Sequence, residues 1–278
     1  MRTEERRTEV GSRGLAPWAL LAGLTGWSWA WWWAATLTGQ GWLEFPTALL
    51  TVAGALGPLV VPAVLLTLGF GGEAPGAFFR RCFDPRTLPL RWYAGLAGLL
   101  LAFAVVPAVL GRGIDGLAPA ASGPAAFLLV GLVAGGIEEP AWRGYAPDGL
   151  QQRLPVVVAS LVIGVVWTLW HLPLFFLEGT YQHSLGIGSA GFWAFQAGPV
   201  VLAVVYGWLY NASGGIAFAA VAFHAVGNLM RELWDAGAPL LQLGVEAGLA
   251  LMVVLAGWPW MWRRQPPHDH QPRLDRRL

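Results

Sequence analysis

The sequence GGIEEPAWR, residues 135–143, places two adjacent carboxylates and an arginine inside an otherwise apolar run. Two later stretches have the same character: WTLWH, residues 167–171, and HAVGN, residues 224–228. An ionisable group at the depth of a bilayer costs about 2.5–3.5 kcal/mol on insertion scales, so such groups are usually paired or functional. The surrounding apolar runs therefore indicate a membrane protein, and the polar stretches indicate its candidate site.

The composition supports a polytopic membrane protein. Of the 278 residues, 56% are hydrophobic and only 12% are charged, whereas a soluble domain has about 25% charged residues. All 17 basic residues are arginine. They exceed the 16 acidic residues by one, and the resulting net charge of +1 does not indicate nucleic-acid binding. The single Cys82 excludes an intrachain disulfide, and we expect it to be a free thiol in a loop rather than a lipidation site.

A spanning helix needs about 20 mostly apolar residues. On this criterion we predict an all-α bundle of about eight transmembrane helices. The first apolar run is longer than the core of a signal peptide, so we expect it to be retained. The fourth is too long for one crossing and is expected to tilt or to project from the membrane, and the seventh is short. The predicted ranges are roughly 15–38, 46–70, 92–111, 123–151, 155–177, 188–210, 214–231 and 239–262.

The distribution of arginines predicts the orientation, because short cytoplasmic loops are enriched in basic residues. With the N-terminus inside, all arginines except Arg112 and Arg231 fall on the cytoplasmic side, so both termini are predicted to be cytoplasmic. The segment 77–86 mixes aromatics with arginine and is either an interfacial element or an ordinary positive-inside loop. The predicted domains are a charged segment 1–14, a bundle 15–262 with the motif core at 123–231, and a disordered tail 263–278.

The spacing in the first stretch separates its two carboxylates. Glu139 and Arg143 are four residues apart, so on one helix they face each other and can form an ion pair. Glu138 points about 100° away and is left without this partner. Gly135 and Gly136 allow another helix to approach the carboxylates closely. Pro140 lacks an N–H and is expected to bend the helix at this point.

The second stretch is expected to meet the first across a helical hairpin. Glu138 lies 16 residues before Leu154 in the expected turn, and His171 lies 17 residues after it. Equal distances from the turn of an antiparallel pair mean equal depth, so the two side chains can meet. Pro173 frees the main-chain carbonyl of Leu169, where irregular backbone could line a wet cavity.

The third stretch contributes His224 and Asn228, four residues apart on one helix face. Both can donate hydrogen bonds, and simple helix–helix contact is the alternative to a functional role. Together with Glu138 as a base and His171 beside it, they suit attack of water on an amide carbonyl. The base deprotonates the water, and the positioned donors stabilise the oxyanion.

The three stretches resemble the motifs of the CPBP intramembrane proteases, also called the ABI or CAAX protease family. Residues 138–143 match EExxxR, residues 167–171 match FxxxH with Trp167 in place of Phe, and residues 224–228 match HxxxN. The motifs follow in the expected order on three spans. The resemblance implies a glutamate-type intramembrane endopeptidase, similar to the Ras-converting CAAX endopeptidase, which removes the last three residues after a prenylated cysteine.

The resemblance also implies roles for the residues that match. Glu138 and His171 would activate the water, and His224 and Asn228 would form the oxyanion hole. Metal-independent chemistry is favoured because the sequence lacks HExxH. If a divalent metal such as zinc is bound, its ligands would be Glu138, His171 and His224. The supporting motif members are Glu139, Arg143 and Trp167.

The expected partners are the lipid bilayer and a membrane-embedded or lipid-modified peptide or protein substrate, with no nucleic acid. We expect an integral membrane protein of a bacterial cell membrane. The alternative function is non-catalytic binding of a partner, as in bacteriocin immunity. A transporter with a proton relay is a third interpretation, but it predicts paired repeats, and the sequence has no repeat of fixed period.

Overall fold

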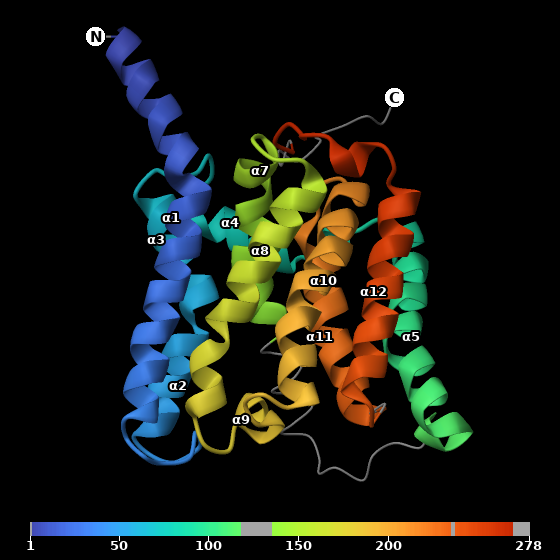
Figure 1. Ribbon diagram of the computed structural model, residues 1–278. Coiled ribbons are helices and arrows are strands. Elements are labelled where there is room, and N and C mark those ends of the chain that lie inside the picture. The colour runs from blue at the N-terminus through green and yellow to red at the C-terminus, as the bar shows by residue number, and fades with distance from the viewer. Residues whose placement is uncertain (1, 118–134, 235–236, 269–278) are drawn as a thin grey trace.

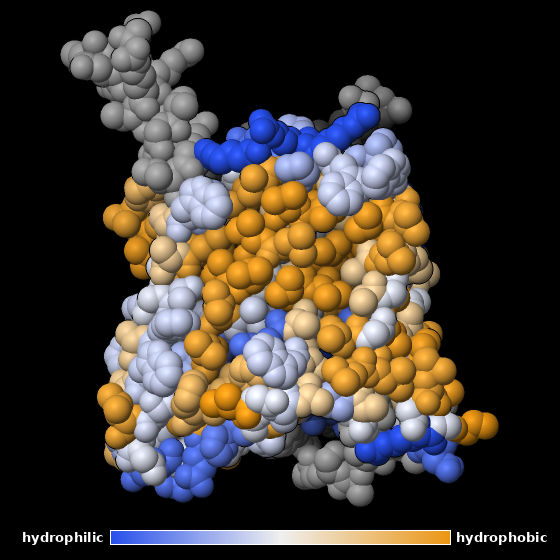
Figure 2. Space-filling model, viewed as in Figure 1, coloured by the Kyte–Doolittle hydropathy of each residue, from blue (hydrophilic) through white to orange (hydrophobic). Residues whose placement is uncertain are grey.

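A computed structural model describes residues 2–117, 135–234 and 237–268 of the chain. Within these residues every regular element is a helix, and Figure 1 shows the helices as an upright bundle. Apolar residues cover the middle of the face seen in Figure 2, and hydrophilic ones gather at its two ends. The predicted all-α fold and the integral membrane character of the protein are confirmed.

The long helices form a row that begins with α1. Helix α1 (Arg2–Thr36) packs against α2 (Thr47–Ala55) and α3 (Gly57–Thr67) at one edge of the bundle (Figure 1). Next come α8 (Val156–Trp170), α10 (Ala190–Ala212) and α12 (Pro239–Ala256), each packed on the one before. Helix α5 (Leu90–Arg112) contacts both α11 (Ala217–Leu233) and α12. The shorter elements are α4 (Pro75–Phe83), η1 (Pro85–Thr87), η2 (Gly113–Leu117), η3 (Pro140–Tyr145), α7 (Ala146–Gln151), η4 (Leu172–Phe176), α9 (Tyr181–Leu185) and η5 (Trp260–Trp262).

Fewer of the described helices than predicted are long and apolar enough to span a membrane. Four helices meet both criteria, and the bent pair α2 and α3 would make a fifth span. Helix α11 has only 17 residues and includes His, Asn and Arg, and the predicted span 123–151 is described only from residue 135. Eight spans therefore stay a prediction. The four helices are Leu90–Gly116, Val156–Phe176, Ala190–Ala212 and Pro239–Ala256.

The segment 46–70, predicted as one span, consists of two helices rather than one continuous helix. Helices α2 and α3 are bent by 51° relative to each other. Pro58 has no N–H to donate to the carbonyl of Gly54, and the hydroxyl of Ser28 donates to that carbonyl at 2.7 Å. The indole N–H groups of Trp27 and Trp32 donate to two further carbonyls of α2. Side chains of α1 thus satisfy main-chain carbonyls at the break, which an apolar environment requires.

The segments that we predicted to flank the bundle are partly ordered. Helix α1 begins at Arg2, so residues 2–14 of the charged segment continue the first span as helix. At the other end, Val156 N donates to Arg263 O at 3.2 Å, and Gln265 N donates to Gln151 O at 3.0 Å. These bonds hold the first part of the predicted disordered tail against the bundle.

Both ends of the described chain lie at one end of the bundle (Figure 1). This agrees with the expectation that the two termini share one side of the membrane. Which side faces the cytoplasm stays a prediction from the arginines. The predicted disorder of residues 269–278 lies outside the described residues.

Candidate active site

The three polar stretches lie on neighbouring elements inside the bundle. Residues 135–139 are helical and lead into η3, which is a π-helix and contacts both α10 and α11. The backbone leaves the α-helical form at Pro140, where the proline predicted an irregularity. The second stretch ends α8, and the third lies within α11. Glu138, His171 and His224 are all buried, with exposed fractions of 8–9%.

Glu139 is the centre of a closed cluster. Arg143 Nη1 donates to Glu139 Oε1 at 3.1 Å and to Oε2 at 3.2 Å, which confirms the predicted ion pair. His224 Nδ1 lies 2.7 Å from the same Oε1. Glu139 is fully buried, and Arg143 is 2% exposed. Both oxygens of Glu139 are engaged, so this carboxylate acts as a partner for charged and polar groups within the fold.

The bond between His224 and Glu139 is a contact that sequence reasoning missed. We expected His224 only beside Asn228, as a donor to the oxyanion. The two residues are 85 positions apart, and no helical periodicity connects them. The only sequence signal was a histidine and a carboxylate inside different apolar spans, where each needs a polar partner.

The guanidinium of Arg143 is held between two aromatic rings. Its Cζ lies 4.0 Å from the ring centroid of Tyr206 and 4.5 Å from that of Trp167. Such placement favours a cation through the quadrupole of each ring. Tyr206 is the second missed residue, because a tyrosine in the apolar helix α10 carries no motif. Arg143 Nη2 is buried and has no hydrogen-bond partner within the described residues.

Trp167 connects Glu138 with His171. Its indole Nε1 donates to Glu138 Oε2 at 2.8 Å, and its main-chain oxygen lies 2.9 Å from His171 Nδ1. We expected that Glu138 and His171 could meet across the helix pair; among the described residues their hydrogen bonds run through Trp167 rather than directly from one to the other. His171 caps the C-terminus of α8, so its ring turns back to the carbonyl four residues earlier.

The position of the Trp167 ring brings the two clusters together. Its centroid lies 5.3 Å from that of His224 and 6.2 Å from that of His171. One indole thus contacts both histidines, stacks on Arg143 and donates to Glu138. A phenylalanine, which the FxxxH motif has here, could provide the contacts between rings but not the N–H donor.

The hydrogen-bond partners of the two histidines indicate where their protons are. A carbonyl oxygen only accepts, so His171 Nδ1 carries a proton and a neutral ring has its lone pair on Nε2. His224 Nδ1 faces a carboxylate, which also only accepts when ionised. His224 Nε2 can therefore donate a hydrogen bond only when the ring is an imidazolium. The two rings are suited to different tasks.

Gly135 and Asn228 are in close contact. A Cβ at position 135 would lie 2.8 Å from Asn228 Nδ2 and 3.0 Å from His224 Cδ2. The absence of a side chain thus permits the approach that we predicted from the glycine. Asn228 is half-buried and makes no hydrogen bond within the described part of the chain, so its amide N–H groups remain available to a ligand.

The carbonyl of Leu169, where we expected that irregular backbone could line a wet cavity, has a hydrogen-bond donor from α1. Pro173 frees it, but Trp29 of α1 donates its indole N–H to this oxygen at 3.2 Å and to that of Trp170 at 3.2 Å. Here, as at the break between α2 and α3, a side chain of α1 replaces the donor that a proline removes: Trp29 at this position and Ser28 at the break. The high tryptophan content thus has one structural explanation.

Cys82 is not in a loop and is not part of the site. It lies on α4, is fully buried and faces Gly144 of η3, where a Cβ would come within 2.7 Å of its Sγ. Burial raises the pKa of the thiol to about 12. The predicted segment 77–86 is helical in its first part, with Phe78 and Cys82 turned inward and Arg80 exposed, so it is an amphipathic element of the fold.

No set of three or more His, Cys, Asp or Glu side chains is arranged to hold a metal ion within the described residues. Glu138, His171 and His224, the ligands named above for a bound metal, do not form such a group. The contacts of these residues instead go to Trp167 and Glu139. The arrangement therefore offers bases and hydrogen-bond donors.

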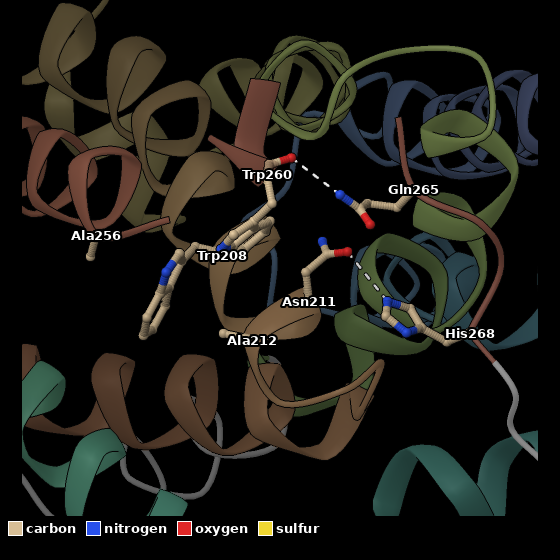
Figure 3. Close-up of a pocket in the computed structure, with 7 residues that line it drawn as sticks. All are labelled: Trp208, Asn211, Ala212, Ala256, Trp260, Gln265 and His268. Atoms are coloured by element: carbon tan, nitrogen blue, oxygen red, sulfur yellow. Dashed lines mark hydrogen bonds between the residues drawn. The ribbon is translucent and has the colours of Figure 1, made fainter. Parts of the chain in front are cut away.

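A pocket in the described part of the chain lies away from the polar stretches. It has a volume of about 460 Å³ and lies among α10, α12 and the C-terminal segment (Figure 3). His268 Nε2 lies 3.2 Å from Asn211 Oδ1 at its rim. Hydrophilic groups are also visible within the apolar face of Figure 2, between α8 and α10. The cavity is lined by Trp208, Asn211, Ala212, Ala256, Trp260, Gln265 and His268.

Two comparisons with known proteins agree with this arrangement. Residues 120–230 match the family described as "Type II CAAX prenyl endopeptidase Rce1-like", a range that contains all three polar stretches. The chain is also similar to "CAAX prenyl protease 2" of Methanococcus maripaludis. The two are 27% identical over 203 residues, which is 66% of this chain and 72% of the relative.

Proposed function

We infer that this chain belongs to the CPBP, or CAAX protease, family and is a CAAX-type endopeptidase, a hydrolase. We propose that it cleaves a peptide bond with water activated by Glu138 and His171. We further propose that its substrate is a prenylated protein or peptide at the membrane. The observation that carries the proposal is the hydrogen-bonded chain from Glu138 through Trp167 to His171. The endopeptidase family favours this function over non-catalytic partner binding.

In the proposed reaction, Glu138 is the base and His171 assists it. Glu138 Oε2 is held by Trp167, and Oε1 has no hydrogen-bond partner within the described residues, so it can accept a proton from water. The lone pair on His171 Nε2 can hold the same water. Glu139 is a poor candidate for the base because Arg143 and His224 engage both of its oxygens.

The oxyanion is proposed to be stabilised by Asn228 and His224. Attack of the water oxygen on the scissile carbonyl forms the C–O bond and places negative charge on the carbonyl oxygen. Asn228 Nδ2 can donate to that oxygen directly. His224 Nε2 can donate only as an imidazolium, with Glu139 as its counter-ion.

Collapse of the tetrahedral intermediate completes the proposed reaction. The C–N bond breaks, and the proton taken from water passes to the departing amine. The products are a new carboxylate on the lipid-modified fragment and a released peptide.

The experiment that tests the function is cleavage of a defined peptide by the purified protein in nanodiscs. The probe ends in S-farnesyl-cysteine followed by three residues, and mass spectrometry measures the released tripeptide. We expect the wild type to release it and expect Glu138→Gln and His171→Ala each to reduce the rate about 10²- to 10⁴-fold.

Glu246→Gln is the matched control for this assay, because Glu246 is a buried carboxylate outside the candidate site. It is expected to keep the wild-type rate. Cleavage at the wild-type rate by folded Glu138→Gln and His171→Ala proteins would contradict the proposed mechanism.

A further inference from the structure

The polar face of α11 continues one turn beyond the candidate site. Arg231 lies seven residues after His224 and three after Asn228 in this unbroken helix. Residues separated by three, four and seven positions share one face of an α-helix. Arg231 is also one of only two arginines that the sequence analysis left off the arginine-rich side, and the proposed reaction does not use it.

Arg231 is held loosely. Its Nη1 lies 3.9 Å from Glu246 Oε1, which is too long for a hydrogen bond, and its Cζ lies 5.7 Å from the ring centroid of Phe103. Its side chain is 40% exposed. Within the described residues the guanidinium makes no hydrogen bond, so its five N–H donors are available.

Glu246 does not depend on Arg231 for a donor. Gln242 Nε2 donates to Glu246 Oε1 at 3.0 Å and lies 3.3 Å from the main-chain oxygen of Phe103. That oxygen is free because Pro107 of α5 has no N–H to donate to it. The Gln242–Glu246 pair thus completes its hydrogen bonds without Arg231.

The distance along α11 from His224 to Arg231 matches the length of a short extended peptide. The helical rise from His224 to Arg231 is about 10.5 Å at 1.5 Å per residue. Three residues of extended chain, from the scissile carbonyl to the terminal carboxylate, span about 10 Å. A substrate carbonyl at His224 and Asn228 would therefore bring a carboxylate three residues later to Arg231.

We propose that Arg231 binds the free C-terminal carboxylate of the substrate and so fixes the cleavage point three residues from its end. The inference rests on the proposed function, because it requires the oxyanion to lie at His224 and Asn228. A guanidinium suits this task because its planar fork binds a carboxylate in bidentate fashion. The substrate class is then a peptide with a free carboxyl terminus, not an internal segment of a membrane protein.

The test compares two probes that differ only at the end of the chain. Both end in S-farnesyl-cysteine followed by three residues, one with a free carboxylate and one with a C-terminal amide. The wild type is expected to prefer the carboxylate by about 10- to 100-fold in kcat/KM, the range for a hydrogen bond to a charged group. Arg231→Met is expected to lose this preference, because its kcat/KM falls for the probe with the free carboxylate and not for the amide probe.

Two further variants separate binding of the substrate from a structural role. Glu246→Gln removes the ion pair but keeps the arginine, so it is expected to retain the preference. Arg231→Lys keeps the charge without the planar fork and is expected to show an intermediate preference.

The inference is overturned if the wild type cleaves both probes equally, or if Arg231→Met retains the preference. It is also overturned if Arg231→Met and Glu246→Gln lose activity equally on both probes, since the ion pair would then be only structural. In each case the proposed hydrolysis still stands if Glu138→Gln abolishes cleavage. If Glu138→Gln does not, the proposed function itself has failed.

Discussion

Two clusters in this bundle contain a glutamate and an arginine among apolar helices, and they are built differently. In the first, Glu139 is fully buried, bonded to Arg143 at 3.1 Å and to His224 at 2.7 Å, and the guanidinium is stacked between rings. In the second, Arg231 is 40% exposed and lies 3.9 Å from Glu246. The comparison indicates that residue type alone does not determine what a buried glutamate and arginine do. What differs between the clusters is whether the two side chains are hydrogen-bonded to each other.

The largest expected effect is on stability and compares the two arginines directly. Arg143→Met leaves Glu139 as a buried, partly unpaired charge and is expected to cost about 3–5 kcal/mol of unfolding free energy. Arg231→Met breaks a loose and partly exposed pair and is expected to cost about 0–1 kcal/mol. Denaturant unfolding of both variants in the same detergent measures the difference, and equal losses would contradict the distinction between the clusters.

The next effect concerns the contact between Gly135 and Asn228. Gly135→Ala places a Cβ within 2.8 Å of Asn228 Nδ2, so the proposed oxyanion donor must move. A displacement of about 1 Å can cost about 10²-fold in rate, and we expect a loss of that order in kcat. Gly244→Ala on α12 is the control, because its Cβ would meet nothing within 4 Å. A Gly135→Ala protein with unchanged kcat would show that Asn228 does not contact the reacting group.

A smaller effect is expected at Trp167, which joins the base to the closed cluster. Trp167→Phe keeps the ring but removes the donor to Glu138 Oε2, and we expect kcat to fall about 10-fold with KM unchanged. Trp142→Phe is the matched control, because the Trp142 indole N–H is equally buried but has no partner among the described residues. Equal kinetics of the two variants would exclude a positioning role for the Trp167 N–H.

The smallest expected effect is at Cys82, which lies in neither cluster. Burial raises the pKa of this thiol to about 12, so at pH 7 to 8 it is protonated as well as inaccessible. We expect maleimide to leave the native protein unlabelled and to label it after denaturation in SDS. Single cysteines introduced elsewhere would then report which ends of the bundle face the cytoplasm, and rapid labelling of the native wild type would show that α4 is not packed as described.

The sequence predicted contacts within one helix better than contacts between helices. The Glu139–Arg143 pair followed from a spacing of four residues, and the three polar stretches followed from charges inside apolar runs. The bond from His224 to Glu139 and the link through Trp167 depend on how separate helices are rotated, which no single segment determines. The break after α2 depends likewise on α1, because Ser28 supplies the donor that Pro58 removes.

The central claim is that two adjacent carboxylates have separate duties, and one paired measurement tests it most directly. Glu138→Gln and Glu139→Gln are each assayed for cleavage of the farnesyl peptide and for unfolding free energy. We predict that Glu138→Gln is as stable as the wild type but inactive, and that Glu139→Gln is strongly destabilised. A stable Glu138→Gln protein that releases the tripeptide at the wild-type rate would contradict the account.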